Sequence, residues 1–141
     1  MTTTLPLTIF PIENDGFHLK LIIKVNGKNA VMILDTGASR TVFDETRIIN
    51  FIGDNNLEEH DKLSTGLGTT TMTSKKVILK KIQFGKILIT NYDATILDLQ
   101  HVNQSYQKLE LESIDGVIGG DILNDYHAVI DYENATLTIE H

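Results

Sequence analysis

The sequence contains no cysteine and no tryptophan, has only two prolines, and carries more acidic than basic residues. The absence of cysteine excludes disulfide bonds, thiolate nucleophiles and cysteine-ligated metal sites. There are 12 Lys and Arg residues against 19 Asp and Glu residues, which gives a formal net charge of −7. A chain of this charge repels the phosphate backbone of nucleic acids, so we expect no nucleic-acid binding.

Long apolar runs are also missing. No segment reaches the roughly 20 apolar residues of a membrane-spanning helix. The first six residues, from Met1 to Pro6, lack the basic and apolar regions of a signal peptide. We therefore expect a cytoplasmic protein with no membrane contact. The 141 residues suffice for one hydrophobic core, so we predict a single domain over residues 1–141.

Short runs of apolar and β-branched residues, separated by turn-forming residues, dominate the chain and predict strands. One or two short helices are expected, at residues 44–50 and 121–126, whereas residues 98–111 are polar and only weakly helical. Many short strands with little helix favour a closed β-barrel or a β-sandwich. The strands are expected at residues 7–12, 17–25, 28–34, 41–43, 77–84, 87–97, 128–132 and 136–139.

The dipeptide Asn26-Gly27 separates two of these expected strands. Asn-Gly favours the left-handed backbone of a tight type I′ turn, so residues 17–34 should form a β-hairpin. The second arm of this hairpin leads directly into Asp35-Thr36-Gly37. A further hairpin is expected over residues 62–81, with a tip rich in Gly and Thr.

Residues 33–39, Ile-Leu-Asp-Thr-Gly-Ala-Ser, are the most informative segment. A carboxylate at the end of a buried strand is costly unless hydrogen bonds satisfy it. Gly37 allows the backbone to turn sharply and to direct N–H groups at that carboxylate. The segment therefore predicts that Asp35 is buried, fixed and reactive. The alternative is that Asp35 is a structural acid of a turn.

Residues 114–123 form a second segment of this kind, in which an apolar run ends at Gly119-Gly120 and a short helix is expected to follow. Glycine permits two backbones to cross closely. The alternative is a simple joint between a strand and a helix.

Together these segments resemble the retropepsin-like aspartic protease family, the single-lobe proteases of retroviral type. Residues 35–39 are similar to the family's catalytic loop. Val117-Ile118-Gly119 is similar to its hydrophobic-hydrophobic-glycine motif, which packs across that loop. Residues 62–77 lie where the family carries the flap that covers the substrate. The resemblance extends over residues 20–140 and implies a mainly β fold, a closed barrel of the acid-protease type with one lobe per chain.

The resemblance also implies an activity, the hydrolysis of peptide bonds by two carboxyl groups that activate one water molecule. The chain has a single Asp-Thr-Gly, so a homodimer is expected to bring Asp35 from both chains together. No cofactor and no metal is implied, and the expected substrate is an extended polypeptide. The implied catalytic residues are Asp35, Thr36 and Gly37, and the implied substrate-binding residues are Ala38, Ser39, Gly66, Leu67, Gly68 and Ile118.

Two departures from the family pattern leave a second function open. The flap segment has no Tyr or Trp. Viral members carry an acid at the position of Ser39 and an arginine at that of Gly120, and this chain lacks the resulting ion pair. The alternative function is a dimeric module of the same fold that binds a peptide or protein with little or no cleavage.

Other kinds of site have weaker support. The Gly66-Leu67-Gly68 tip lacks the lysine of a phosphate-binding loop. The five histidines show no metal-ligand spacing. Ser39 lacks the Gly-x-Ser-x-Gly pattern of a hydrolase nucleophile. The acids Asp115, Asp121 and Asp131 are interpreted as loop and cap residues.

Overall fold

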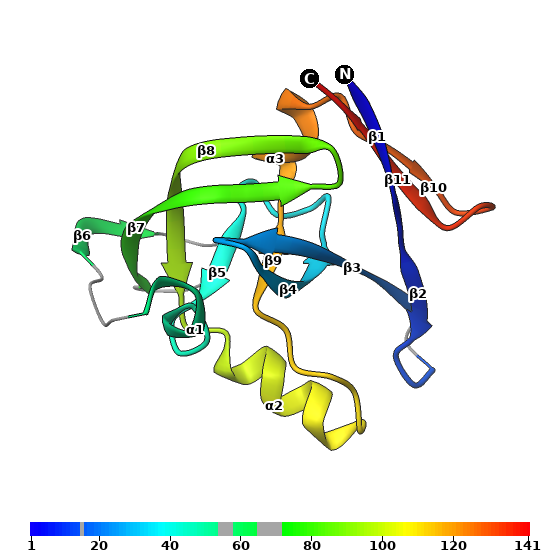
Figure 1. The fold of residues 1–141 in the computed structure, drawn as a ribbon. Helices are drawn as coiled ribbons and strands as arrows, with labels where there is room; N and C mark the ends of the chain where they lie inside the picture. The colour runs from blue at the N-terminus through cyan, green and yellow to red at the C-terminus, as the bar shows by residue number, and fades with distance from the viewer. Residues whose placement is uncertain (15, 54–57, 65–71) are drawn as a thin grey trace.

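A closed barrel of six strands forms the centre of the computed structural model, which describes residues 1–14, 16–53, 58–64 and 72–141 (Figure 1). The barrel closes where the last strand in its order returns to the first, with Val25 opposite Ile82. The mainly β fold and the closed barrel are therefore confirmed, and the sandwich is excluded. Around the barrel the strands are β3 (Phe17–Val25), β4 (Lys28–Leu34), β9 (Gly116–Ile118), β5 (Val42–Asp44), β8 (Ile87–Leu97) and β7 (Met72–Phe84).

The two ends of the chain form a separate three-stranded sheet of β1 (Thr2–Pro6), β11 (Thr136–Glu140) and β10 (Val129–Asp131). Met1 and His141 each donate a hydrogen bond to the other's carbonyl, at 2.8 Å (Figure 1). The sequence predicted the β10–β11 hairpin and a strand at residues 7–12, which is present as β2 (Thr8–Pro11), but it did not predict β1. Local pattern missed β1 because the strand contains a single aliphatic residue, Leu5, and its pairing partner is at the far end of the chain.

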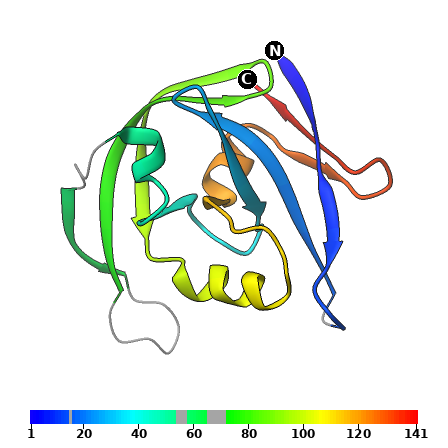
Figure 2. The same ribbon diagram turned by 60° about the horizontal axis from the view of Figure 1, so that its bottom comes forward.

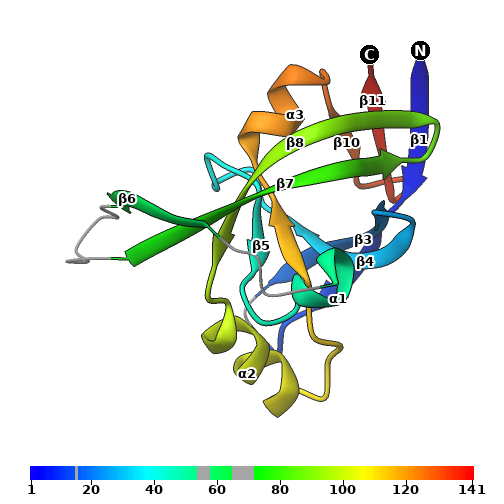
Figure 3. The ribbon, with the colours of Figure 1, turned by 60° about the vertical axis from the view of Figure 1, so that its left-hand side comes forward.

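Two strands extend the barrel sheet. β2 pairs with β3, and β6 (Glu58–Ser64) pairs with β7 on the side away from the terminal sheet (Figure 3). The hairpin predicted over residues 62–81 is thus present as β6 and β7. Its tip, with Gly66, Leu67 and Gly68, lies outside the described residues.

The predicted type I′ hairpin is present between β3 and β4. Asn26 and Gly27 have φ angles of 49° and 83°, the left-handed conformation that this turn requires. Alternate β3 residues, Leu19, Leu21 and Ile23, point into the core and are at most 6% exposed. The hairpin thereby fixes the direction of β4 toward Asp35.

The described residues form three helices, α1 (Ile49–Ile52), α2 (Gln100–Lys108) and α3 (Gly120–Asp125), where one or two were expected. The helix predicted from Asp44 begins later than expected. Asp44 instead ends β5, and its carboxylate accepts hydrogen bonds from the N–H groups of Arg47 at 3.0 Å and Leu99 at 2.9 Å. None of the described helices has the length and apolar character needed to cross a membrane.

Helix α2 lies at the end of the barrel opposite the chain termini, and Figure 2 turns this end forward. It is stabilised by a second small core in which Tyr106 packs with Ile33 and Ile114. Asn103 binds the backbone of Ile114 in both directions, through its amide at 3.1 Å and its side-chain oxygen at 2.8 Å. These contacts explain why a polar, weakly helical segment forms a helix: tertiary packing supplies what propensity does not.

Tyr106 should make the stability of the protein depend on pH in the alkaline range. Burial raises the pKa of the Tyr106 phenol from 10.0 to about 12, and its oxygen lies 2.6 Å from Nδ1 of His18. Between these pH values the unfolded chain loses the phenol proton while the folded chain keeps it, so the free energy of unfolding falls as pH rises. Between pH 9 and pH 11, we expect the free energy of unfolding to fall by about 1 kcal/mol less in Tyr106→Phe than in the wild type.

The measurement is urea unfolding at both pH values. Tyr132→Phe is the matched control, because Tyr132 is 62% exposed and should leave the wild-type slope unchanged. Identical pH slopes for the wild type and Tyr106→Phe would contradict the prediction.

Candidate active site

The Asp35 loop follows directly from the end of β4. The N–H of Asp35 donates to the carbonyl of Ile118 at 3.0 Å, and the N–H of Ala38 donates to the carbonyl of Asp35 at 3.1 Å. The N–H of Gly37 donates to Oδ1 of Asp35 at 2.9 Å. The loop therefore holds its own carboxylate in one orientation, as the sequence predicted for an acid beside glycine.

The exposure of the loop differs from the expectation. Asp35, Thr36, Gly37 and Ser39 are exposed and Ala38 is half-buried. The sequence predicted a buried Asp35, and for the single chain this is wrong. The apolar residues of β4 are buried, but the strand ends at the rim of the barrel, so the chain turns out of the core at the acid itself.

β9 crosses between β4 and β5 beside this loop. It runs parallel to β4, with Leu34 opposite Ile118, and antiparallel to β5, with Val42 opposite Val117. The predicted crossing of the second segment over the first is therefore present. The side chain of Ile118 is fully buried in the main core, so this residue contacts the loop through its carbonyl.

Gly119 is the point at which the crossing segment approaches the backbone of residues 38–40 closely. A Cβ atom there would lie 2.6 Å from the carbonyl carbon and oxygen of Arg40 and 2.8 Å from the carbonyl oxygen of Ala38. The N–H of Gly120 donates to the Ala38 carbonyl at 2.7 Å, and the N–H of Asp121 donates to the Ser39 carbonyl at 3.1 Å. These two backbone hydrogen bonds flank positions 39 and 120, at which viral members carry an ion pair.

Sequence reasoning missed the role of Asp121, which was interpreted as a cap. Its Oδ1 accepts hydrogen bonds from the N–H and the hydroxyl of Thr41, both at 2.8 Å, and its Oδ2 accepts one from the Tyr92 hydroxyl at 2.9 Å. Burial, with the hydrogen bond to Asp121 as the next cause, raises the pKa of Tyr92. No local pattern signals this contact, because its members come from three distant segments.

Asp115 was also interpreted as a loop acid and is instead a buried, paired carboxylate. Its Oδ1 lies 2.7 Å from Nε of Arg47, and its Oδ2 accepts the N–H of Val31 at 2.8 Å. The bond from Val31 ties the residue before β9 to β4, and the bond from Arg47 ties it to the segment between β5 and α1.

A sequence model of the aspartyl protease family matches residues 21–122, which include the Asp35 loop and the crossing segment. The chain belongs to the aspartyl protease family. A search among curated proteins finds no significant match.

Solved structures of similar fold are retropepsin-like. A retropepsin-like aspartic protease from Rickettsia conorii has a TM-score of 0.56 at 18% identity, covering 99% of this chain and 91% of that one. The retroviral protease-like domain of Ddi1 from Leishmania major has a TM-score of 0.59 at 13% identity, covering 88% and 89%. The EIAV protease in an inhibitor complex has a TM-score of 0.57 at 16% identity, covering 82% and 93%. At these identities the similarity establishes the fold.

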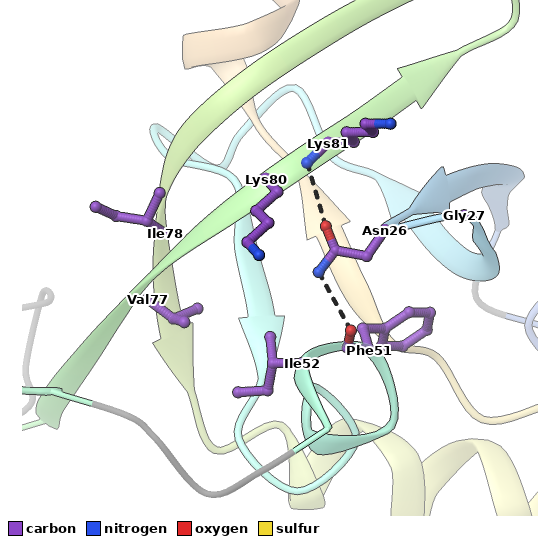
Figure 4. Close-up of a pocket in the computed structure, with 8 residues that line it drawn as sticks. All are labelled: Asn26, Gly27, Phe51, Ile52, Val77, Ile78, Lys80 and Lys81. Carbon is purple, nitrogen blue, oxygen red and sulfur yellow. Dashed lines mark hydrogen bonds between the residues drawn. The ribbon is translucent and has the colours of Figure 1, made fainter.

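This aspartyl protease family member also has a pocket of about 670 Å³ whose lining includes no residue of the Asp35 loop (Figure 4). It lies between the β3–β4 turn, α1 and β7. Asn26 borders it and bridges these elements, donating to the carbonyl of Phe51 at 3.2 Å and accepting the N–H of Lys81 at 3.2 Å. The lining residues that the structure describes include no carboxylate, and the described residues contain no group of three or more metal-ligating side chains.

The contact at Gly119 leads to a sharp stability prediction. Gly119→Ala should destabilise the protein by about 1–3 kcal/mol or more, because the new methyl group meets backbone atoms that cannot rotate away. Gly120→Ala is the matched control: its Cβ would have its nearest contact at 3.4 Å, an ordinary van der Waals distance. Chemical denaturation of both variants is the measurement, and equal stabilities would contradict the close contact.

Proposed function

We propose that this protein is an aspartic endopeptidase that hydrolyses peptide bonds as a homodimer, with Asp35 of each chain contributing one carboxyl group. The supporting observation is the state of Asp35 in the single chain. Its carboxylate is held by the Gly37 N–H at 2.9 Å but remains exposed at the rim of the barrel. The chain has no second Asp-Thr-Gly, so another copy is the natural source of the missing acid.

In this mechanism two carboxyl groups hold one water molecule. Two carboxyl groups sharing such a site cannot both ionise, so one proton is shared between them, as in aspartic proteases generally. The ionised group removes a proton from the water, which attacks the scissile carbonyl carbon. The protonated group donates its proton to the carbonyl oxygen, which gives a tetrahedral gem-diol. The first group then passes the proton taken from water to the amide nitrogen while the second group takes back a proton from one hydroxyl, so the C–N bond breaks and an amine and a carboxylic acid are released.

The neighbours of Asp35 have supporting roles in this proposal. Thr36 donates a hydroxyl hydrogen bond across the dimer axis, and Gly37 shapes the loop and binds substrate through its backbone. Ala38 and Ser39 line the substrate path, and Ile118 acts through the carbonyl that holds Asp35. The substrate binds as an extended strand under the segment containing Gly66, Leu67 and Gly68. No cofactor takes part.

A peptide- or protein-binding module of the same fold is the second candidate function. Two features favour it: the flap segment has no Tyr or Trp, and no ion pair joins positions 39 and 120. Such a module would bind extended peptides and release them uncut. Cleavage of a peptide library, followed by mass spectrometry, separates the two functions.

Asp35→Asn should abolish peptide cleavage and leave the protein folded. The amide can neither accept the proton of water nor donate as a carboxylic acid does, and the substitution removes both members of the pair at once. We expect a loss of at least about 10³-fold in kcat/KM, with an unchanged circular dichroism spectrum. Activity near that of the wild type would show that the essential acid is another residue.

The specific activity of the wild type should fall on dilution, because only the dimer contains both carboxyl groups. Activity per chain and sedimentation should change over the same concentration range. Addition of excess Asp35→Asn protein should inhibit the wild type by forming mixed dimers with one carboxyl group. A monomer that retains full activity per chain would rule out the shared site.

A further inference from the structure

The carboxylate of Asp121 is the most heavily used side-chain acceptor near the Asp35 loop. It receives three hydrogen bonds of 2.8–2.9 Å, two from Thr41 and one from Tyr92. Thr41 is fully buried, and Asp121 is half-buried. Asp121 has no ion-pair partner in the described parts of the chain, so neutral donors alone satisfy it.

These bonds join the Asp35 loop to two other elements. Thr41 ends the loop that starts at Asp35, Asp121 lies in the first turn of α3, and Tyr92 belongs to β8. The Thr41 hydroxyl also accepts the N–H of Gly119 at 3.0 Å. A continuous hydrogen-bonded chain therefore runs from β8 through Asp121 and Thr41 to the backbone of the crossing segment.

We propose that Asp121 is a positioning residue that fixes the far end of the Asp35 loop and thereby sets the place of the Asp35 carboxylate. The near end of the loop is held by the bond from the Asp35 N–H to the Ile118 carbonyl, at 3.0 Å. Between these two anchors the loop is exposed except at the half-buried Ala38, and the N–H groups of Gly120 and Asp121 hold the carbonyls of Ala38 and Ser39. The inference rests on the proposed function, because it assigns to Asp121 the alignment of the proposed carboxyl pair.

A carboxylate suits position 121 because both of its oxygen atoms accept hydrogen bonds. One carboxylate oxygen serves both donors of Thr41, and the other serves the Tyr92 hydroxyl. Asparagine would retain the first oxygen for Thr41, and its amide could donate to the Tyr92 oxygen. Alanine would leave the Thr41 N–H and the Tyr92 hydroxyl without this acceptor.

Misplacement of the loop should affect turnover more than binding. The two carboxyl groups must lie at bonding distance from one water molecule, and a displacement of about 1 Å can lower a rate by about 10²-fold. Peptide binding depends on many backbone contacts spread over an extended groove, so KM is less sensitive. A split between kcat and KM is therefore the signature of a positioning role.

The experiment compares Asp121→Ala, Asp121→Asn and the control Asp125→Ala in the full chain. Asp125 is an exposed acid of the same helix with no side-chain hydrogen bond in the described structure. For each variant, kcat and KM are measured per folded dimer. Hydrogen exchange of the Thr41 and Gly119 amides is followed by NMR, because both amides belong to the network and report on it without any activity.

For Asp121→Ala we expect kcat to fall by about 10²-fold with KM changed by less than about threefold, and both amides to exchange faster. Asp121→Asn should recover kcat to within about tenfold of the wild type, since a neutral acceptor makes weaker hydrogen bonds than a carboxylate. Asp125→Ala should match the wild type. If Asp121→Ala does not fold, Tyr92→Phe removes one donor only and should shift kcat and exchange in the same direction by less.

The inference is overturned if Asp121→Ala, or Tyr92→Phe in its place, keeps wild-type turnover and exchange. It is also overturned if turnover falls while the two amides stay protected, or if Asp121→Asn is as impaired as Asp121→Ala. If the wild type cleaves no peptide, the proposed function fails by itself. The exchange data then still decide whether Asp121 holds the loop.

Discussion

The backbone contact between Gly119 and residues 38–40 is the constraint on which the rest of the site depends. A side chain at residue 119 would meet main-chain atoms at 2.6 Å, so the two segments can approach only at a glycine. That approach allows the Gly120 and Asp121 N–H groups to bind the loop carbonyls directly. The barrel strands β4 and β5 then pair with β9 on either side of it. The Asp35 loop is therefore shaped by main-chain hydrogen bonds, which vary little with side-chain rotamers.

The single chain closes its own barrel, but under the proposed function it supplies only one of the two carboxyl groups. Its terminal strands pair with each other, and Met1 and His141 close the sheet through their own backbones. Its main core is a continuous cluster of buried apolar residues. Under the proposed function the exposed carboxylate of Asp35 needs a second carboxyl group, because one group must accept a proton from the water while the other donates one to the substrate. Folding and the proposed activity thus place different demands on association.

Much of the fold was predictable because the local turn and strand signals agree with the final structure. Asn26-Gly27 specified the turn, and the alternation in residues 17–25 specified the buried face of β3. The prediction was incomplete where stability comes from distant partners. β1 depends on β11, and α2 depends on a second core around Tyr106. Asp44 accepts the N–H of Arg47, as a capping residue would, but it also binds the N–H of Leu99, a residue that no local pattern associates with it.

The sequence by itself determined the chemical groups of the site: one Asp-Thr-Gly after a buried strand, and an apolar segment ending in two glycines. Those signals are local, because turn geometry and strand burial depend on neighbouring residues. Only the tertiary structure decided that Asp35 is exposed in the single chain and that Asp121 reaches Thr41 and Tyr92. The physical reason is that hydrogen bonds between segments follow from how the barrel closes. Barrel closure depends on the packing of the whole chain, which no short stretch of residues encodes.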